Sequence, residues 1–248
     1  MNTKETLQND ITHIELRYFS ILNHIASNSF LSQGKCPYIE ARKSITYAFS
    51  IEKMNPALYE AMISSGFRRD GYFFYKNLCP GCRSCIPIRI DINNFRPSKS
   101  QRRILKKNQD VTITRNPVGF DPESFLLYKK YCTLKHGSVK DEEDYMRFLI
   151  DSPVNTDMMR YYIGNHLIGI GWTDVLPNSL SSVYYAFDPD FSSRGPGVFS
   201  LLKEIELCRE LKKEWLQLGF WIEECHKMSY KNRYKPYQLL TDGRWQEY

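Results

Sequence analysis

The stretch Cys79–Asn108, CPGCRSCIPIRIDINNFRPSKSQRRILKKN, is the most informative part of the sequence for the fold. It opens with three cysteines, each separated from the next by two residues, and the alternating run Ile86–Ile92 then predicts a β-strand. Ser98 can cap a helix that follows the strand. On such a helix the spacing i, i+3, i+4, i+7 and i+8 places five cations on one face, here called the cationic stripe: Lys99, Arg102, Arg103, Lys106 and Lys107.

Charge is distributed unevenly along the chain. The 248 residues carry 34 Lys and Arg against 28 Asp and Glu, a net charge of +6. Between residues 83 and 107 the only acid is Asp91, while the rest of the chain is close to neutral. A local basic patch on a neutral body favours a docking surface for a polyanion over a general basic coat. The alternative is a solvated helix face with no partner.

The length is enough for one large domain or two small ones, and the ordinary apolar content predicts a true core. Met1–Ile11 is polar and lacks the pattern of a secretory signal. No run of about twenty apolar residues is present to span a bilayer. We therefore expect a cytoplasmic protein without a membrane partner.

Cysteine usage raises the question of a metal. Seven cysteines are an odd number, which in a reducing compartment favours free thiols or metal ligands over disulfides. Four of them could supply thiolates to a zinc ion or an iron–sulfur cluster: Cys36, Cys79, Cys82 and Cys85. The competing interpretation is a group of partly buried free thiols.

The order of predicted elements divides the chain at residues 1–115 and 116–248. The first part holds a helix after Asn55-Pro56, the strand Ile86–Ile92 and the cationic helix. The second part begins with a helix from Asp121 to Gly137 and another over 141–150. A three-strand meander between Arg160 and Phe187 follows, and then a glycine loop, a helix over 198–213 and a strand over 215–222. This order resembles a GNAT-type acyltransferase domain and predicts an α/β fold.

Two segments of the second part suggest chemistry. In Arg194-Gly195-Pro196-Gly197, backbone N–H groups at a helix start could hold the pyrophosphate of coenzyme A or the terminal nucleotide of a charged tRNA. Asp188 at a strand end could orient or deprotonate an attacking amine. Ordinary turns would explain both patterns equally well.

The C-terminal run Cys225–Pro236 alternates cations with tyrosines. Stacking combined with phosphate contact is how proteins hold single-stranded RNA ends, although a solvated helix turn is the alternative. No serine–histidine–acid or paired-carboxylate pattern is present, and Cys225 and His226 are adjacent, so a covalent intermediate is not indicated.

Long motifs in one order then resemble a known family. They are Cys36-Pro37-Tyr38 with Arg42, Gly66–Gly71, Cys79–Ile90, Phe95–Arg103, Tyr184–Gly197, Leu218–Pro236 and Asp242–Trp245. On these the chain is identified as a member of the bacterial arginyl-tRNA–protein transferase family, and it resembles the leucyl branch. Eukaryotic relatives carry a C-x-x-C near the start, whereas here the third position after Cys36 is Ile39.

The resemblance implies a GNAT-like transferase half paired with a smaller N-terminal α/β domain. It implies transfer of leucine from leucyl-tRNA to the N-terminus of proteins that begin with Asp or Glu, which marks them for degradation by the N-end rule. The ester is already activated, so no cofactor is required. Three alternatives stay open: arginine as the transferred residue, a non-enzymatic RNA-binding protein, and a coenzyme A acetyltransferase.

The expected site has three parts. Asp188 would act as base or orient the amine, with Tyr184 as a proton donor. The tRNA would be held by the cationic stripe and its surroundings, namely Arg96, Lys99, Arg102, Arg103, Lys106, Arg194, Gly195, Gly197, Lys227, Tyr230, Lys231 and Arg233. Because bidentate guanidinium pairing suits a carboxylate, the acidic side chain of the acceptor would be read by one of Arg42, Arg68, Arg69 and Arg89.

Overall fold

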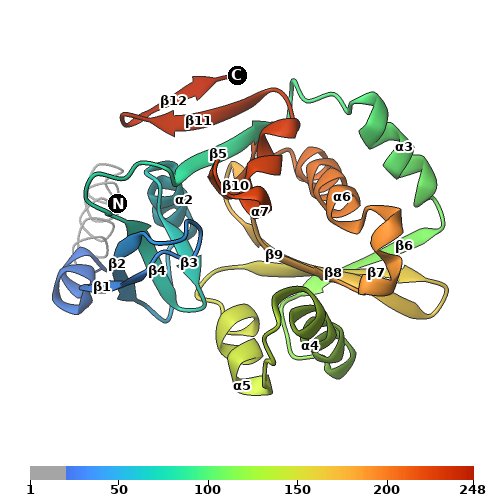
Figure 1. The fold of residues 1–248 in the computed structure, drawn as a ribbon, viewed down its shortest axis with the longest axis horizontal. Coiled ribbons are helices and arrows are strands. Elements are labelled where there is room, and N and C mark those ends of the chain that lie inside the picture. The colour runs from blue at the N-terminus through green and yellow to red at the C-terminus, as the bar shows by residue number, and fades with distance from the viewer. Residues whose placement is uncertain (1–20) are drawn as a thin grey trace, which may run out of the picture.

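The computed structural model describes residues 21–248, so the expectation for Met1–Ile11 lies outside the described residues. Two sheets form the frame of the molecule (Figure 1). The smaller is antiparallel in the order β1-β2-β4-β3 and packs against helix α2 (Pro56–Ser64). Its strands are β1 (Phe30–Lys35), β2 (Lys43–Ser50), β3 (Arg68–Asp70) and β4 (Phe73–Asn77).

The larger sheet has eight strands in the order β12-β11-β5-β10-β9-β8-β7-β6. Their bounds are β5 (Ile86–Asp91), β6 (Val111–Pro117), β7 (Thr156–Ile163), β8 (His166–Val175), β9 (Ser179–Phe187), β10 (Trp215–Trp221), β11 (Tyr237–Thr241) and β12 (Arg244–Glu247). All its pairings are antiparallel except that of β9 with β10. Strand β5 inserts between β10 and β11, and the division expected after residue 115 falls inside β6.

Helices cover both faces of the larger sheet (Figure 1). On one face lie α4 (Pro122–His136), α5 (Glu142–Tyr145) and the π-helical turn η1 (Met146–Ile150). On the other lie α6 (Pro196–Glu210) and α3 (Lys99–Lys107). The 3₁₀ turn η2 (Pro189–Arg194) leads into α6, and the short α7 (His226–Ser229) and η3 (Tyr230–Arg233) follow β10. No helix in the described residues is long and apolar enough to cross a membrane.

The predicted helix starts are confirmed where the sequence supplied a cap. Ser98 and Gln101 form a reciprocal capping box at the start of α3. Asn55 caps α2, and Asp121 caps α4. Helix α4 ends at Gly137, whose φ of 62° is in the left-handed region that favours glycine. The meander of β7, β8 and β9 is also confirmed, while α6 begins two residues earlier than predicted.

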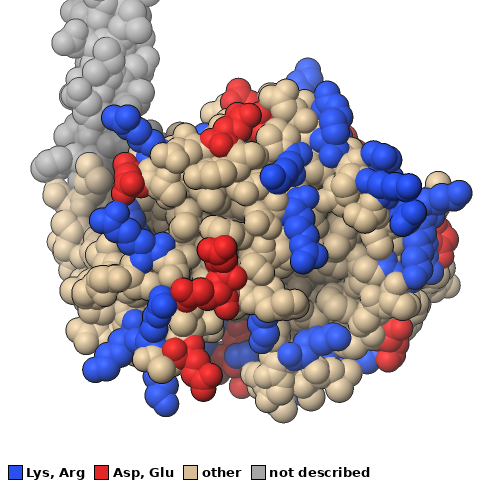
Figure 2. Space-filling model, turned by 45° about the horizontal axis from the view of Figure 1, so that its top comes forward, with Lys and Arg blue, Asp and Glu red and all other residues tan. Residues whose placement is uncertain are grey.

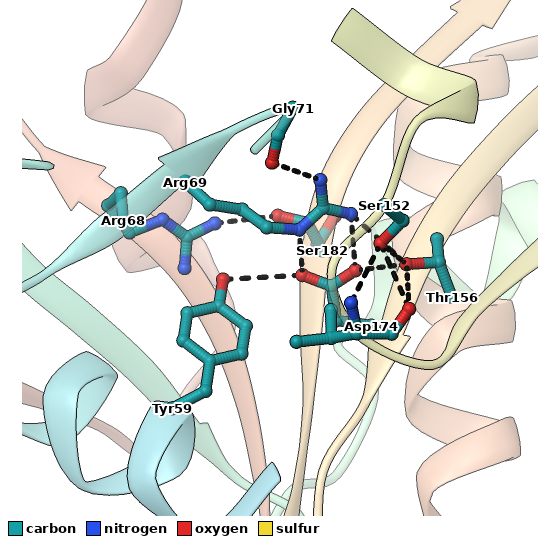
Figure 3. Close-up of polar contacts among 9 residues, drawn as sticks. Tyr59, Arg68, Arg69, Gly71, Ser152, Thr156, Asp174 and Ser182 are labelled. Atoms are coloured by element: carbon teal, nitrogen blue, oxygen red, sulfur yellow. Dashed lines mark hydrogen bonds and ion pairs between the residues drawn. The ribbon is translucent and has the colours of Figure 1, made fainter. Parts of the chain in front are cut away.

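One buried ion pair joins the two sheets (Figure 3). Arg69 on β3 donates from Nε to Oδ2 of Asp174 on β8 at 2.7 Å, and from a terminal nitrogen to Oδ1 at 2.5 Å. The hydroxyls of Thr156 and Tyr59 also donate to this carboxylate, at 2.7 and 3.2 Å. Both charged side chains are inaccessible to solvent. Four hydrogen bonds therefore hold the Asp174 carboxylate in place and fix β3 against the larger sheet.

Removing one partner of this pair should be costly. Arg69→Met keeps most of the side-chain volume but leaves Asp174 buried without its cation, which destabilises a protein by about 3–5 kcal/mol. Arg83→Met is the matched control, because Arg83 pairs with Asp242 at 2.9 Å while both side chains are more than three-quarters exposed. That substitution should cost less than about 1 kcal/mol. Urea unfolding measures both values, and equal losses would contradict a joining role for Arg69.

Candidate functional site

Strands β9 and β10 pair over only three residues and then separate. The parallel register runs from Trp215–Ser179 to Gln217–Ser181. Beyond it β9 stays paired to β8 as far as Phe187, while β10 stays paired to β5 as far as Trp221. Gly219, at a φ of 76°, lies where the β10–β5 register shifts. We call the point where these two strands part the β9–β10 fork.

Two cations satisfy backbone groups at the β9–β10 fork. A terminal nitrogen of Arg68 donates to the carbonyl of Ser182 on β9 at 2.9 Å (Figure 3). Nζ of Lys231 donates to the carbonyl of Phe220 on β10 at 2.8 Å. Burial, with a smaller effect from Arg68, lowers the pKa of Lys231 to about 7. Since buried carbonyls need partners, these side chains stabilise the separated strands.

This placement separates Lys231 from the other members of its run. Lys231 is buried, so it does not form part of the surface expected to contact tRNA. Its neighbours Lys227, Tyr230 and Arg233 are exposed on α7 and η3 and remain candidates for that contact. The alternation of cations and tyrosines in the sequence did not indicate that Lys231 would be buried.

A carboxyl group is buried beside the β9–β10 fork. Glu204 on α6 is 1% exposed, and its Oε1 accepts from the hydroxyl of Ser182 at 3.3 Å. Within the described residues its Oε2 has no hydrogen-bond partner. Burial without a cation raises the pKa of Glu204 to about 8. The group is therefore largely neutral near pH 7.

Asp188 ends β9 and is held by three donors. Its carboxylate accepts from Nζ of Lys130 at 2.6 Å, from Nε2 of His166 at 3.3 Å and from the backbone N–H of Asp190 at 3.1 Å. Burial acts to raise the pKa of Asp188, but these bonds outweigh it and lower the pKa overall. A carboxylate that is already held by three donors is suited to positioning Lys130 and His166, and the predicted role of Asp188 as base or amine-orienting group stays a prediction.

Tyr184 has different partners from Asp188. Its hydroxyl lies 3.3 Å from Nε2 of His136 and 4.0 Å from Sγ of Cys132. The two residues are four positions apart on β9, about 13 Å along the backbone, and their side chains have no partner in common. Burial raises the pKa of Tyr184, which keeps its hydroxyl protonated. Its role as a proton donor stays a prediction.

His136 is the site residue that sequence reasoning missed. Burial lowers its pKa, and the nearby charge of Lys227 lowers it further. The imidazole is therefore in contact with Tyr184 on the sheet and within range of the charge of Lys227. In the sequence, His136 is distinguished only by its place before Gly137, where a basic residue commonly ends a helix.

The cationic stripe is exposed along all of α3. The opposite face of the helix packs inward through Gln101, Ile104 and Leu105. A groove of about 480 Å³ runs between α3 and α6, and its cations are Arg102, Lys106 and Lys203. Figure 2 shows Lys and Arg side chains gathered on the side where Figure 1 places α3. Arg96 is exposed just before the helix, with its guanidinium bonded to the carbonyls of Asn93 and Phe95.

The loop before α6 anchors this helix. Arg194 donates to Oδ1 of Asn108 at 3.0 Å and to the carbonyl of Lys107 at 2.8 Å, and it forms an ion pair with Asp110. Gly195 has a φ of 67°, and a Cβ there would lie 2.7 Å from Cδ1 of Ile104. Arg194 and Gly195 therefore dock α3 instead of presenting themselves to a nucleotide. Gly197 is exposed and has open space around it.

The four candidate acceptor arginines lie in separate places. Arg69 forms the buried ion pair with Asp174, and Arg68 donates a hydrogen bond to a carbonyl at the β9–β10 fork. Arg89 is stacked between Trp215 and Trp245, with its guanidinium carbon 3.7 and 4.2 Å from the ring centroids. Burial lowers the pKa of Arg89 to about 10. Because Arg69 and Arg89 are fully occupied, we leave them out of the acceptor site.

Arg42, the fourth candidate, is exposed beside the cysteines. Its guanidinium approaches Sγ of Cys82 at 3.6 Å and pairs with Glu224 at 3.2 Å. Burial raises the pKa of Cys85 to about 11, and neighbouring thiols add to the shift. Across residues 21–248 no three His, Cys, Asp or Glu side chains are grouped as metal ligands. A zinc or iron–sulfur site at Cys36, Cys79, Cys82 and Cys85 stays a prediction, and no reaction step is assigned to it.

Two family models match, "Arginine-tRNA-protein transferase, N terminus" over residues 34–103 and "Arginine-tRNA-protein transferase, C terminus" over residues 123–241. A protein named aspartate/glutamate leucyltransferase from Alcanivorax borkumensis is 38% identical over 86% of this chain and 90% of its own. The chain belongs to the arginine-tRNA-protein transferase family.

Two further members of this family carry the same name. The protein from Shewanella putrefaciens is 38% identical over 85% of this chain and 91% of its own, and that from Thiobacillus denitrificans is 36% identical over 87% and 92%. Among solved structures, one titled "Crystal structure of FemX" covers 78% of this chain and 80% of that chain at 7% identity, with a TM-score of 0.44.

The buried carboxyl beside the β9–β10 fork predicts a pH dependence of stability. Glu204 keeps its proton in the folded state up to about pH 8 and loses it in the unfolded state near its ordinary pKa of 4.5. Between these values the folded state binds more protons, so stability falls as pH rises, by about 1.4 kcal/mol per pH unit from this group. Chemical unfolding of Glu204→Gln at pH 5 to 8 should lack that slope.

Glu206→Gln on the same helix is the control for this experiment. Glu206 is partly exposed and pairs with Lys203 at 2.7 Å. The Glu206→Gln protein should keep the wild-type slope, and a slope unchanged in Glu204→Gln as well would show that Glu204 is ionised in the folded protein.

Proposed function

We propose that this chain transfers leucine from leucyl-tRNA to the N-terminus of proteins that begin with Asp or Glu. The observation that carries the proposal is the similarity to proteins named aspartate/glutamate leucyltransferase over about nine-tenths of their length. The fold supports it, because α3 with its cationic stripe is anchored beside the start of α6, the helix that packs against β9 and β10. The reaction would mark its protein substrates for degradation, and its use of charged tRNA suits the cytoplasm.

The reaction needs little chemical assistance. The amine nitrogen attacks the ester carbonyl carbon, the carbon–oxygen bond to the ribose breaks, and a proton passes from the amine to the ribose oxygen. An α-amine has an ordinary pKa of about 7.7–8.0, so a useful fraction is neutral at cellular pH. Holding the ester and the amine together can supply about 7–11 kcal/mol. No nucleotide cofactor is needed, since the ester is activated beforehand.

The side chains near the β9–β10 fork fit supporting roles in this reaction. The protonated hydroxyl of Tyr184 is a candidate donor to the departing oxygen or to the oxyanion. Asp188 positions Lys130 and His166 at the end of β9. The exposed Lys227, Tyr230 and Arg233 would hold the terminal nucleotide of the tRNA, while the cationic stripe would hold its acceptor arm.

A transfer assay tests the proposal directly. Purified protein is incubated with labelled leucyl-tRNA, arginyl-tRNA or acetyl-coenzyme A and with peptides that begin with Asp, Glu or Ala. We expect label from leucyl-tRNA on the Asp and Glu peptides only. Label from arginyl-tRNA would establish arginine as the transferred residue, and label from acetyl-coenzyme A would establish an acetyltransferase. RNA binding without any transfer would indicate a binding protein.

The cationic stripe predicts a second result. Arg102→Glu with Arg103→Glu should weaken tRNA binding and reduce the slope of log K against log salt, because each lost phosphate contact releases fewer counterions. The control is Lys212→Glu with Lys213→Glu, two cations that follow α6. Fluorescence anisotropy with labelled tRNA at several salt concentrations measures both effects. An unchanged salt slope in the α3 variant would place tRNA elsewhere.

A further inference from the structure

A cavity separates the small sheet from the helices that cover the larger one. Its volume is about 530 Å³, within the range of small-molecule sites. The hairpin of β3 and β4 forms one side, and α4, α5 and η1 form the other. The two sides are in close contact at one edge, since a Cβ on Gly71 would collide with the carbonyl of Arg147. We call this space the hairpin cavity.

The hairpin cavity is lined by charges of both signs. The cations are Lys140 and Arg147, and the acids are Asp70 and Asp144. Arg147 and Lys140 both pair with Asp144, at 2.7 and 3.5 Å. Asp70 is an exposed residue and, within the described residues, has no cation within 4.0 Å; partial burial of its carboxyl raises its pKa, and the charges of Arg147, Arg69 and Lys140 partly oppose this. The cavity therefore has an unpaired acid facing two cations that share one partner.

The remaining lining is neutral and partly aromatic. Phe73, Tyr128 and Phe148 contribute rings, and the hydroxyl of Tyr184 meets the imidazole of His136. Lys227, from the exposed C-terminal run, is close enough to lower the pKa of His136. The hairpin cavity thus adjoins both the proposed proton donor and the run proposed to hold the tRNA end.

We propose that the hairpin cavity binds the N-terminal residue of the acceptor protein, with its α-ammonium at Asp70 and its acidic side chain at Arg147 and Lys140. This inference rests on the proposed function and names the residues that set its specificity. An N-terminal Asp or Glu carries one positive and one negative group a few ångströms apart, and the cavity offers one unpaired acid, Asp70, and two cations that share Asp144 as their partner. No candidate arginine from the sequence has this combination.

The donor's leucyl side chain is the competing occupant. Four charged side chains line the hairpin cavity, and a methyl-rich side chain would displace water from them without forming a hydrogen bond or ion pair in return. An acidic residue with a free amine would instead pair with them. The mixture of charge and aromatic surface therefore favours the acceptor over the donor.

Peptide binding without tRNA tests the inference separately from the transfer reaction. Three pentapeptides differ only at the first residue, which is Asp, Asn or N-acetyl-Asp, and calorimetry measures their affinities. Wild-type protein should bind the Asp peptide best. Arg147→Ala should erase the preference for Asp over Asn, a loss of about tenfold or more, since hydrogen bonds to charged groups are strong. Asp70→Asn should erase the preference for the free amine over the acetylated one.

The matched control is Arg115→Ala. Arg115 also forms a partly exposed pair with an aspartate, Asp157 at 3.4 Å, but it lies on the edge strand β6. This variant should retain both preferences. Arg147→Lys keeps the charge and should restore part of the preference for Asp, which separates a specific loss from misfolding.

The outcomes distinguish the two proposals. If both preferences survive in Arg147→Ala and Asp70→Asn, the hairpin cavity is not the acceptor site. If these variants instead weaken leucyl-tRNA affinity and leave peptide binding intact, the cavity belongs to the donor and the inference is overturned. If wild-type protein transfers nothing yet both preferences behave as expected, the inference stands and the proposed function fails.

Discussion

The buried pair of Arg69 and Asp174 is the constraint on which the arrangement of the protein depends. A charge inaccessible to water is tolerated only with a partner of opposite sign and enough hydrogen bonds to satisfy it. The carboxylate of Asp174 meets both conditions only when β3 lies against β8. Tyr59 adds a bond from α2 to the same carboxylate. The position of the small sheet, and with it one wall of the hairpin cavity, follows from this requirement.

Backbone carbonyls at the β9–β10 fork also need hydrogen-bond donors. Where two strands separate, their carbonyl groups lose the hydrogen bonds between the strands. Here Arg68 donates to a carbonyl on β9, and Lys231 donates to a carbonyl on β10. Arg68 comes from the small sheet and Lys231 from η3, so both are tied to the same opening. The residues that hold the opening are thus distinct from the exposed ones proposed to bind tRNA. Cations that are neighbours in the sequence therefore have different roles: the buried Lys231 stabilises the β9–β10 fork, and the exposed ones are proposed to bind tRNA.

Much of the local structure was predictable because its causes are local. A capping serine, the alternation of Ile86–Ile92 and the period of the cationic stripe each act within a few residues. The family resemblance was also accessible, because it rests on motifs spread through the chain. Strand β5 was predicted as a strand, but its neighbours β10 and β11 lie more than 120 residues away in sequence. Pairing between strands so far apart along the chain produces no periodic pattern in the sequence.

The capped starts of α2, α3 and α4, the exposed cationic face and the family could be read from the sequence alone, since each depends on residue type and spacing. The tertiary structure decided which charges are free. Arg69 and Arg89 look like carboxylate readers in the sequence, but Asp174 in one case and two tryptophan rings in the other occupy them. Arg147 lay in no motif and Asp70 was only a member of the Gly66–Gly71 motif with no role of its own, yet packing of the hairpin against η1 brings them to one cavity. Whether a charge is available depends on burial and on neighbours distant in the chain.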